Sequence, residues 1–172
     1  MHTFVICGYG IPPAIQEDQN YLTYLHVVFN RMYELAAGEE AGIIPCGGPT
    51  SCMPPYEGTE AMLMAGYLRI LMGQEGVELV TSRWRIFPEE RSLSTLENLL
   101  FAKEIIEQNA HTSPVTIFCE KTREGRVSAF AKQIFPQNDV VVFAIDFDIS
   151  KNRYLDPELI QKKEARAQEE GL

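Results

Sequence analysis

The sequence predicts an α/β fold with a mostly parallel sheet of about five strands, covered by helices on both faces. Short, uninterrupted apolar segments alternate along the chain with longer segments whose apolar residues recur at helical spacing. Uninterrupted apolar strands are typical of parallel sheets that are buried on both faces. Right-handed crossovers would then place every strand-to-helix loop at the same edge of the sheet.

Five segments are predicted as strands because each is short, apolar and rich in β-branched or aromatic residues. They span residues 3–7, 43–46, 84–87, 115–119 and 140–145. Residues 77–81 could form an additional short strand. Pro45 has no amide hydrogen for a strand ladder, so it should lie at the end of its strand or beside a bulge.

Four helices are predicted between these strands from apolar residues at helical spacing. They cover residues 21–37, a segment from the N-cap Thr59 to Gly73 or Gly76, a segment that follows Ser94, and residues 127–135.

The length, net charge and hydrophobic pattern of the chain limit its domain organisation and its possible partners. A chain of 172 residues suits one domain, predicted over residues 1–150, and residues 151–172 form a highly charged helical tail of that domain. The formal net charge of −9 argues against general nucleic-acid binding. The longest apolar run, residues 140–145, is far too short to span a membrane. No signal segment opens the sequence, so a cytoplasmic protein is expected.

The four cysteines, Cys7, Cys46, Cys52 and Cys119, lack the close pairing of a zinc site. They are expected to be reduced and mostly buried thiols, with no metal bound. Three of them end predicted strands at one edge, which allows a redox or metal role as a further hypothesis. Burial of small apolar thiols in strands explains the same pattern more simply.

The polar segment at residues 89–98 lies between a predicted strand and a predicted helix, where ligands settle in open α/β sheets. Ser94 and Glu97 fit a capping box, which accounts for the helix start. The box leaves five polar residues unexplained: Glu89, Glu90, Arg91, Ser92 and Asn98. A solvated loop is the alternative interpretation of this segment.

Two glycine turns end the first two predicted strands. Gly8 and Gly10 follow the first strand, but no third glycine completes a dinucleotide-binding fingerprint, and a tight turn is the better interpretation. Gly47 and Gly48 follow the second strand. They would let the backbone approach a ligand closely, with amides free to face an anion. An ordinary flexible connection is the alternative.

Lys121, Arg123 and Arg126 fall where the fourth predicted strand turns into its helix. Cations are disfavoured at a helix N-terminus, so this placement predicts an anion nearby. That anion would be a ligand phosphate or carboxylate, or a carboxylate of the 89–98 segment. Neutralisation of the acidic segment alone is the alternative.

Two motifs of this sequence resemble the YdcF-like family, whose relatives include the SanA and ElyC proteins. The first is Cys46-Gly47-Gly48 with Glu60-Ala61 downstream, and the second is Glu89-Glu90-Arg91-Ser92-x-Ser94-Thr95-x-Glu97-Asn98, which is close to the family's Glu-Asp-x-Ser-x-Asn-Thr-x-Glu-Asn. The similarity spans roughly residues 5–135. It implies a Rossmann-like three-layer α/β/α sandwich. Family-type positions are held by Gly47, Gly48, Glu60, Glu89, Ser92, Thr95, Glu97, Asn98 and Arg126.

The sequence departs from that pattern at three positions. Cys46 stands where serine is usual, Ser94 where asparagine is usual, and Arg123 where a histidine usually lies. Arginine stays protonated, so it cannot carry a proton as that histidine could. Proposals for the family include binding of nucleotide-like ligands such as S-adenosylmethionine and roles in envelope carbohydrate metabolism.

The first functional hypothesis is an enzyme, of hydrolase or transferase type, that acts on a small anionic metabolite, phosphorylated or nucleotide-linked. Glu89, Glu90 or Glu97 would act as a general base or hold a divalent cation. The residues expected to bind the ligand are Gly8, Gly10, Gly47, Gly48, Glu60, Ser92, Thr95, Asn98, Lys121, Arg123 and Arg126. The alternative is a non-catalytic module or sensor for a nucleotide or an S-adenosylmethionine-type ligand.

Overall fold

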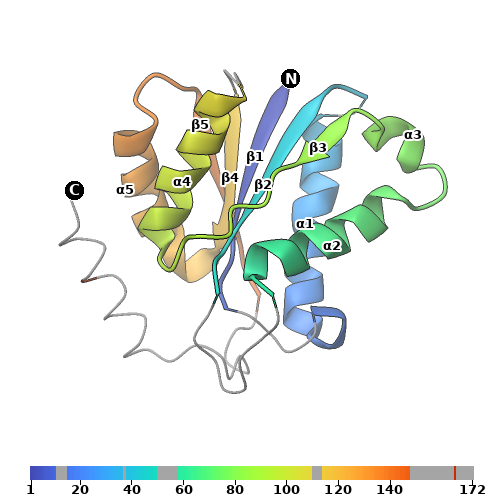
Figure 1. Ribbon diagram of the computed structural model, residues 1–172, viewed down its shortest axis with the longest axis horizontal. Coiled ribbons are helices and arrows are strands. Elements are labelled where there is room, and N and C mark those ends of the chain that lie inside the picture. The colour runs from blue at the N-terminus through green and yellow to red at the C-terminus, as the bar shows by residue number, and fades with distance from the viewer. Residues whose placement is uncertain (11–14, 37, 50–57, 110–113, 148–164, 166–172) are drawn as a thin grey trace.

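The computed structural model describes residues 1–10, 15–36, 38–49, 58–109, 114–147 and 165, which form a parallel sheet between two layers of helices (Figure 1). The five strands are β1 (His2–Cys7), β2 (Ala41–Cys46), β3 (Trp84–Ile86), β4 (Val115–Glu120) and β5 (Val140–Ile145). Every neighbouring pair is parallel, in the order β3-β2-β1-β4-β5. The predicted Rossmann-like α/β fold and its five strands are therefore confirmed.

The helices divide between the two faces of the sheet (Figure 1). Helices α1 and α2 cover one face, and α4 and α5 cover the other. The helices are α1 (Gln19–Leu35), α2 (Glu60–Met72), α3 (Glu78–Thr81), α4 (Thr95–Gln108) and α5 (Glu124–Ile134).

Alternation along the strands builds one core on each face, because successive side chains of a strand point in opposite directions. In β1, Phe4 and Ile6 pack toward α1 and α2, whereas Val5 and Cys7 pack toward α4 and α5. Both sets are almost fully buried. The uninterrupted apolar strands of the sequence are thus explained by a sheet that is covered twice.

Local signals set the ends of α1. The side chain of Asp18 accepts hydrogen bonds from the amides of Asn20 (2.9 Å) and Tyr21 (3.0 Å), so the helix begins two residues before the predicted start. At the other end the C-cap is Ala36, and Gly38 follows with a φ of 74°. The predicted stop at Gly38 is therefore close to the observed one.

Pro45 lies one residue from the end of β2, as the sequence predicts. The neighbouring strand β3 ends at Ile86, which pairs with Ile43. Residue 45 would be the next residue of β2 to donate a backbone hydrogen bond toward β3. Proline has no amide hydrogen, so this bond is missing and the regular pairing stops. The ladder resumes where the amide of Glu89 donates to the carbonyl of Pro45 at 2.9 Å.

The additional strand considered at residues 77–81 is wrong, because Glu78–Thr81 form the single helical turn α3. The Thr81 hydroxyl donates to the carbonyls of Met72 (3.2 Å) and Val77 (3.1 Å), which fixes this turn against the end of α2. The place beside β2 is taken by β3, which pairs with it from Trp84 onward. Tertiary pairing therefore overrides the β-branched composition of the segment.

The strand order reverses between β1 and β4, since the chain moves outward through β2 and β3 before it returns to β4. In open α/β sheets a crevice for ligands lies beyond the carboxyl ends of the two strands at such a reversal. No helix in the described part of the chain is both long and apolar enough to cross a membrane. The predicted tail, residues 151–172, lies outside the described residues except for Ala165, which is helical and exposed. Cys52 also lies outside them.

Candidate functional site

The loops that follow β1, β2, β3 and β4 meet at one edge of the sheet, joined by hydrogen bonds. The amide of Gly8 donates to the carbonyl of Cys46 (2.9 Å), and the amide of Gly47 donates to that of Glu89 (3.0 Å). The Arg123 guanidinium donates to the carbonyl of Gly8 (2.8 Å). Parallel topology thus brings together residues that are more than 100 positions apart.

Glu60 occupies the glycine turn after β1. Its Oε1 accepts hydrogen bonds from the amides of Tyr9 (2.9 Å) and Gly10 (2.8 Å) and from the Tyr21 hydroxyl. The side chain is buried, and this burial raises the pKa of its carboxyl group, against the effect of these hydrogen bonds and of Arg123. The amides of this turn therefore hold a carboxylate of the chain itself.

Glycine is required at two positions because the Glu60 side chain passes so close to the backbone. A Cβ atom at Gly8 would lie 2.3 Å from Cδ of Glu60, and a Cβ atom at Gly47 would lie 2.8 Å from its Cβ. Gly47 also has a φ of 157°, a backbone conformation that favours glycine. These two glycines make room for Glu60.

The prediction that the amides of Gly47 and Gly48 are free to face an anion is wrong. The amide of Gly47 donates to the carbonyl of Glu89, and the amide of Gly48 donates to that of Ser92 at 2.7 Å. A Cβ atom at Gly48 would lie 2.6 Å from the same Ser92 oxygen. The two glycines therefore dock the loop after β2 onto the loop after β3.

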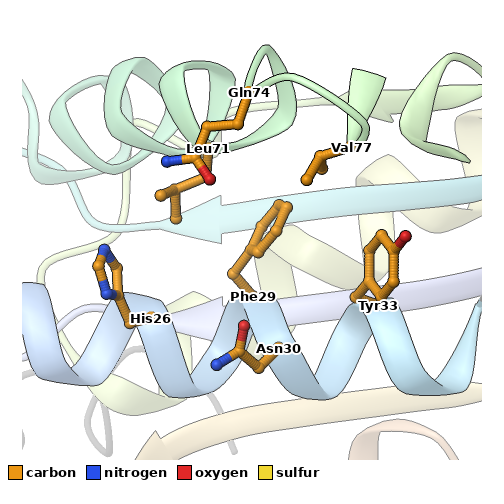
Figure 2. Close-up of a pocket in the computed structure, with 7 residues that line it drawn as sticks. All are labelled: His26, Phe29, Asn30, Tyr33, Leu71, Gln74 and Val77. Carbon is orange, nitrogen blue, oxygen red and sulfur yellow. The ribbon is translucent and has the colours of Figure 1, made fainter. Parts of the chain in front are cut away.

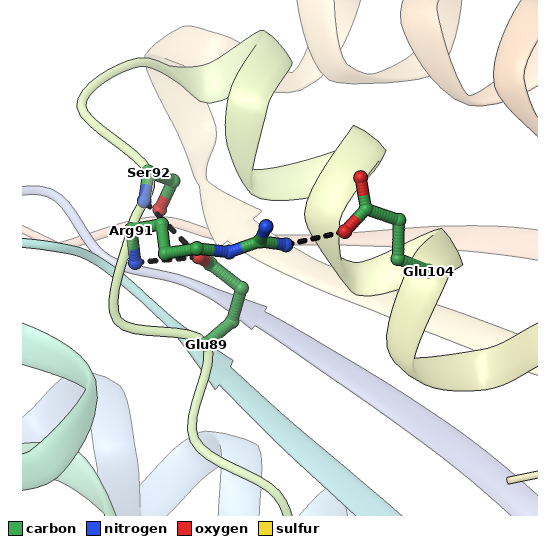
Figure 3. A network of polar contacts seen from close by, with 4 residues as sticks. All are labelled: Glu89, Arg91, Ser92 and Glu104. Carbon is green, nitrogen blue, oxygen red and sulfur yellow. Dashed lines mark hydrogen bonds and ion pairs between the residues drawn. The ribbon is translucent and has the colours of Figure 1, made fainter. Parts of the chain in front are cut away.

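Glu89 is the most deeply buried acid of the predicted catalytic set, with 1% of its surface exposed. Its Oε1 accepts hydrogen bonds from the amides of Arg91 (2.7 Å) and Ser92 (3.1 Å), as Figure 3 shows. Its Oε2 is buried without a hydrogen-bond partner among the described residues. Burial raises the pKa of this carboxyl group. Burial therefore favours the protonated form of the Glu89 carboxyl group.

Arg91 follows Glu89 closely in sequence, but its guanidinium turns toward α4 (Figure 3). It stacks over the Phe101 ring, 4.1 Å from the centroid, and pairs with the carboxylate of Glu104. The backbone amide of Arg91 makes the hydrogen bond to Glu89, and the guanidinium acts on that carboxylate only through its charge. The side chain instead ties the loop to the outer surface of α4.

Glu90 and Glu97 contact the starts of two helices. Exposed Glu90 accepts a hydrogen bond from the hydroxyl of Thr59 (2.8 Å), which itself caps α2 through the amide of Met62 (3.2 Å). The predicted N-cap at Thr59 is thereby confirmed. Both carboxylates lie at helix N-termini, where a negative charge is favourable.

The capping box at the start of α4 is confirmed. Ser94 Oγ accepts a hydrogen bond from the amide of Glu97 (3.2 Å), and the Glu97 carboxylate accepts one from the amide of Leu93 (2.5 Å). The reciprocal bond reaches one residue further back than in the standard box. Thr95 and Asn98 are buried in the first turn of the helix, where the Asn98 side chain lies within hydrogen-bonding reach of the Cys7 thiol.

The three predicted cations separate into two groups. Lys121 is exposed and pairs with Glu124 (2.5 Å), which raises the pKa of the lysine, so the structure does not bring it to the site. Arg123 and Arg126 are both half-buried. Burial and the neighbouring charge of Arg123 lower the pKa of Arg126, while Glu120 acts in the opposite direction. Two guanidinium groups thus lie close together beyond β4.

Several residues of this edge were not identified from the sequence. Tyr21 donates to Glu60, the Tyr9 ring stacks on Tyr21 at 4.5 Å, and the Tyr24 hydroxyl donates to the carbonyl of Cys7 (2.8 Å). Glu120 is buried at the end of β4 and accepts a hydrogen bond from the amide of Thr122 (2.5 Å). The available signal was the pair of tyrosines three positions apart, which share a helix face with the apolar stripe of α1.

Cys7, Cys46 and Cys119 are buried free thiols at the ends of β1, β2 and β4. Burial raises the pKa of Cys7 to about 11 and that of Cys119 to about 12. Within the described ranges, no three histidine, cysteine, aspartate or glutamate side chains are grouped so that they could hold a metal ion.

Comparison of the chain with protein-family models, with curated proteins and with solved structures finds no match.

Proposed function

We propose that this chain is a YdcF-like protein that binds a small anionic metabolite, phosphorylated or nucleotide-like, beyond the carboxyl ends of β1 and β4. The observation that carries the proposal is the pair of half-buried guanidinium groups, Arg123 and Arg126, at the reversal of strand order. Burial, and after it the repulsion between the two like charges, lowers the pKa of Arg126. A bound anion would relieve the repulsion, and arginine suits phosphate and carboxylate through its planar set of donors.

Two carboxylates of the chain also act on these arginines. Glu60 interacts with the charge of Arg123 and Glu120 with that of Arg126, and each carboxylate accepts hydrogen bonds from backbone amides as well. Arg123 keeps its orientation through the Gly8 carbonyl. The geometry favours a ligand that docks against an ordered pair of cations.

In an enzyme of hydrolase or transferase type, Glu89 is the preferred acid–base group. A general acid or base works best when its pKa lies near the pH of the reaction, and burial moves the pKa of Glu89 in that direction. The carboxylates of Glu90 and Glu97 remain candidates for a base or for a divalent cation, but each already serves a helix start.

A non-catalytic nucleotide or S-adenosylmethionine-type sensor is the second candidate. It is favoured by Arg123, which stands where the resembling family usually has a histidine. Because arginine stays protonated, it can hold an anion but cannot relay a proton.

A thermal-shift experiment tests the anion site, with inorganic phosphate, a nucleoside monophosphate and a sugar phosphate as separate probes. A probe present at about 100 times its dissociation constant should add roughly 2.7 kcal/mol to the free energy of unfolding. Arg126→Ala should abolish the effect, whereas Lys121→Ala, which removes one exposed cation, should leave it unchanged.

The proposal fails if none of the three probes raises the melting temperature, or if Arg126→Ala responds as the unmodified chain does. Turnover then separates the two candidates. Release of phosphate or transfer of a group from a binding probe, lost in Glu89→Gln while binding persists, supports the enzyme. Binding without turnover supports the sensor.

A further inference from the structure

A hollow lies between α1 and the end of α2, and it shares no residue with the site at the strand ends (Figure 2). Its volume is about 350 Å³. It is lined by His26, Phe29, Asn30 and Tyr33 of α1 and by Leu71, Gln74 and Val77 on the opposite side. The α1 residues are spaced as i, i+3, i+4 and i+7, so they form one stripe about 10 Å long.

The hollow has an apolar floor and polar side chains at its margin. Phe29 and Leu71 are buried, whereas Asn30 and Gln74 are exposed on opposite walls. Beside it, His26 stacks on Tyr67 and shares a 2.8 Å hydrogen bond with its hydroxyl. A hollow that combines aromatic and aliphatic side chains with a few polar groups is typical of binding sites.

The helices around the hollow also carry most of the exposed apolar surface. Six large apolar side chains are strongly exposed in the described part of the chain, and four of them belong to α1, α2 and α3: Val27, Met62, Ile70 and Leu79. The most exposed, Leu79 at 78%, follows Val77 by two residues. The helices that form the hollow therefore carry more of the strongly exposed apolar side chains than the rest of the described chain.

The charge beside the hollow is negative. Glu75 and Glu78 flank Gln74 and Val77, both are exposed, and neither carboxylate has an ion pair or hydrogen bond with a described residue. Among the residues that the structure describes, no lysine or arginine lines the hollow. The single arginine of α1, Arg31, pairs with Glu34 of the same helix (2.8 Å).

We propose that this hollow is a docking site for a basic amphipathic helix of a partner protein. The aromatic and aliphatic side chains of the hollow, spread over two turns of α1, can receive apolar anchors that a helix presents at i, i+3, i+4 and i+7. Lysine or arginine beside those anchors would meet Glu75 and Glu78. The side-chain amides of Asn30 and Gln74 can bond to the polar groups between the anchors.

The chain contains its own reporter for this interaction. Trp84 is the only tryptophan of the sequence. Its ring packs directly behind the hollow, with centroids 5.9 Å from Phe29 and 6.5 Å from Tyr33. A helix that seats on Phe29 and Tyr33 should therefore change the emission of Trp84.

The experiment titrates the full chain with a synthetic helical peptide of leucine and lysine, with leucine at i, i+3, i+4 and i+7. A peptide in which glutamate replaces every lysine is the control. We expect a saturable change in Trp84 emission with the lysine peptide alone. Glu75→Lys with Glu78→Lys should weaken binding at least about tenfold, because it reverses the charge beside the site.

The matched control is Glu17→Lys with Glu107→Lys, two exposed carboxylates away from the hollow whose reversal changes the net charge equally. Binding by this variant should stay within about twofold of the original. Equal weakening in both variants would show only general attraction to an acidic chain and would overturn the proposal. Binding without a change in Trp84 emission, no binding at all, or a dimer of the chain that Glu75→Lys with Glu78→Lys disrupts would also overturn it.

Discussion

At the scale of single residues, Glu89 shows how burial can prepare a carboxyl group for chemistry. Its folded pKa is raised above the ordinary value of 4.5 by burial. Such a group binds its proton more tightly in the folded state, so its contribution to stability is fully present below the unfolded pKa. That contribution is lost as the pH rises through the folded pKa.

Glu89→Gln should therefore change the pH dependence of stability in one direction. The variant should gain stability relative to the original chain as the pH rises from about 4.5 toward neutrality, because glutamine has no proton to lose. Urea unfolding at a series of pH values measures the difference. A difference that does not change with pH would mean that the Glu89 carboxyl group is not desolvated.

Gly8 and Gly66 should respond oppositely to alanine. Gly8→Ala should destabilise the fold by about 1–3 kcal/mol, because the new Cβ atom would meet the Glu60 carboxyl group, which three hydrogen bonds hold in place. Gly66→Ala should stabilise it by about 0.5–1 kcal/mol, because Gly66 is exposed inside α2 with nothing within 4 Å of the added atom. Chemical unfolding compares the two. Neutral behaviour of Gly8→Ala would show that Glu60 does not occupy the turn after β1.

At the scale of elements, local signals and tertiary contacts had different predictive value. The start of α4 followed from Ser94 and Glu97 because a capping box acts within four residues. The turn α3 could not be predicted from local sequence signals, because it is stabilised by the hydrogen bond from the Thr81 hydroxyl to the end of α2. The length of β3, only three residues, depends on its pairing with β2. The sequence therefore predicts helix starts better than it predicts short elements held by their neighbours.

The cap of α4 separates a structural role from a functional one. Ser94→Ala should lower the free energy of unfolding by about 0.5–2 kcal/mol, because it removes the acceptor for the amide of Glu97. Glu97→Gln keeps an acceptor for the amide of Leu93 and should lose at most about 0.3–1 kcal/mol of helix-dipole energy. Chemical unfolding and the anion-induced thermal shift are measured together. An unchanged anion response in Glu97→Gln would leave Glu97 as a cap and restrict the acid–base candidates to Glu89, which is preferred, and Glu90.

At the scale of the whole molecule, the topology predicted where the site residues meet but not what they contact. Parallel strands with right-handed crossovers place the loops after β1, β2, β3 and β4 at one edge, and this followed from the order of the segments. The contacts of Glu60 could not be predicted from the order of the segments, because the amides that bind its side chain lie about 50 residues earlier in the chain. For the same reason the amides of Gly47 and Gly48 appeared free, although the 89–92 loop satisfies them.

The central strands make the thiols reporters of global unfolding. Cys7, Cys46 and Cys119 lie on β1, β2 and β4, which are the three inner strands of the sheet, and each thiol is at most 1% exposed. Burial raises the pKa of Cys7 to about 11, so almost none of it is thiolate at neutral pH. A thiol reagent should therefore reach these residues only when the sheet opens.

Pulses of iodoacetamide across a urea gradient, read by mass spectrometry, measure this opening. Labelling of the three thiols should rise together at the unfolding midpoint, while a cysteine introduced by Leu79→Cys, at a site 78% exposed, should react at once in the native state. In denaturant without reductant, all four native thiols, Cys52 included, should be labelled. Rapid labelling of Cys7 in the native state would contradict its burial beneath α4. Fewer than four reactive thiols after denaturation would reveal a disulfide or another modification, which would contradict the prediction of free thiols.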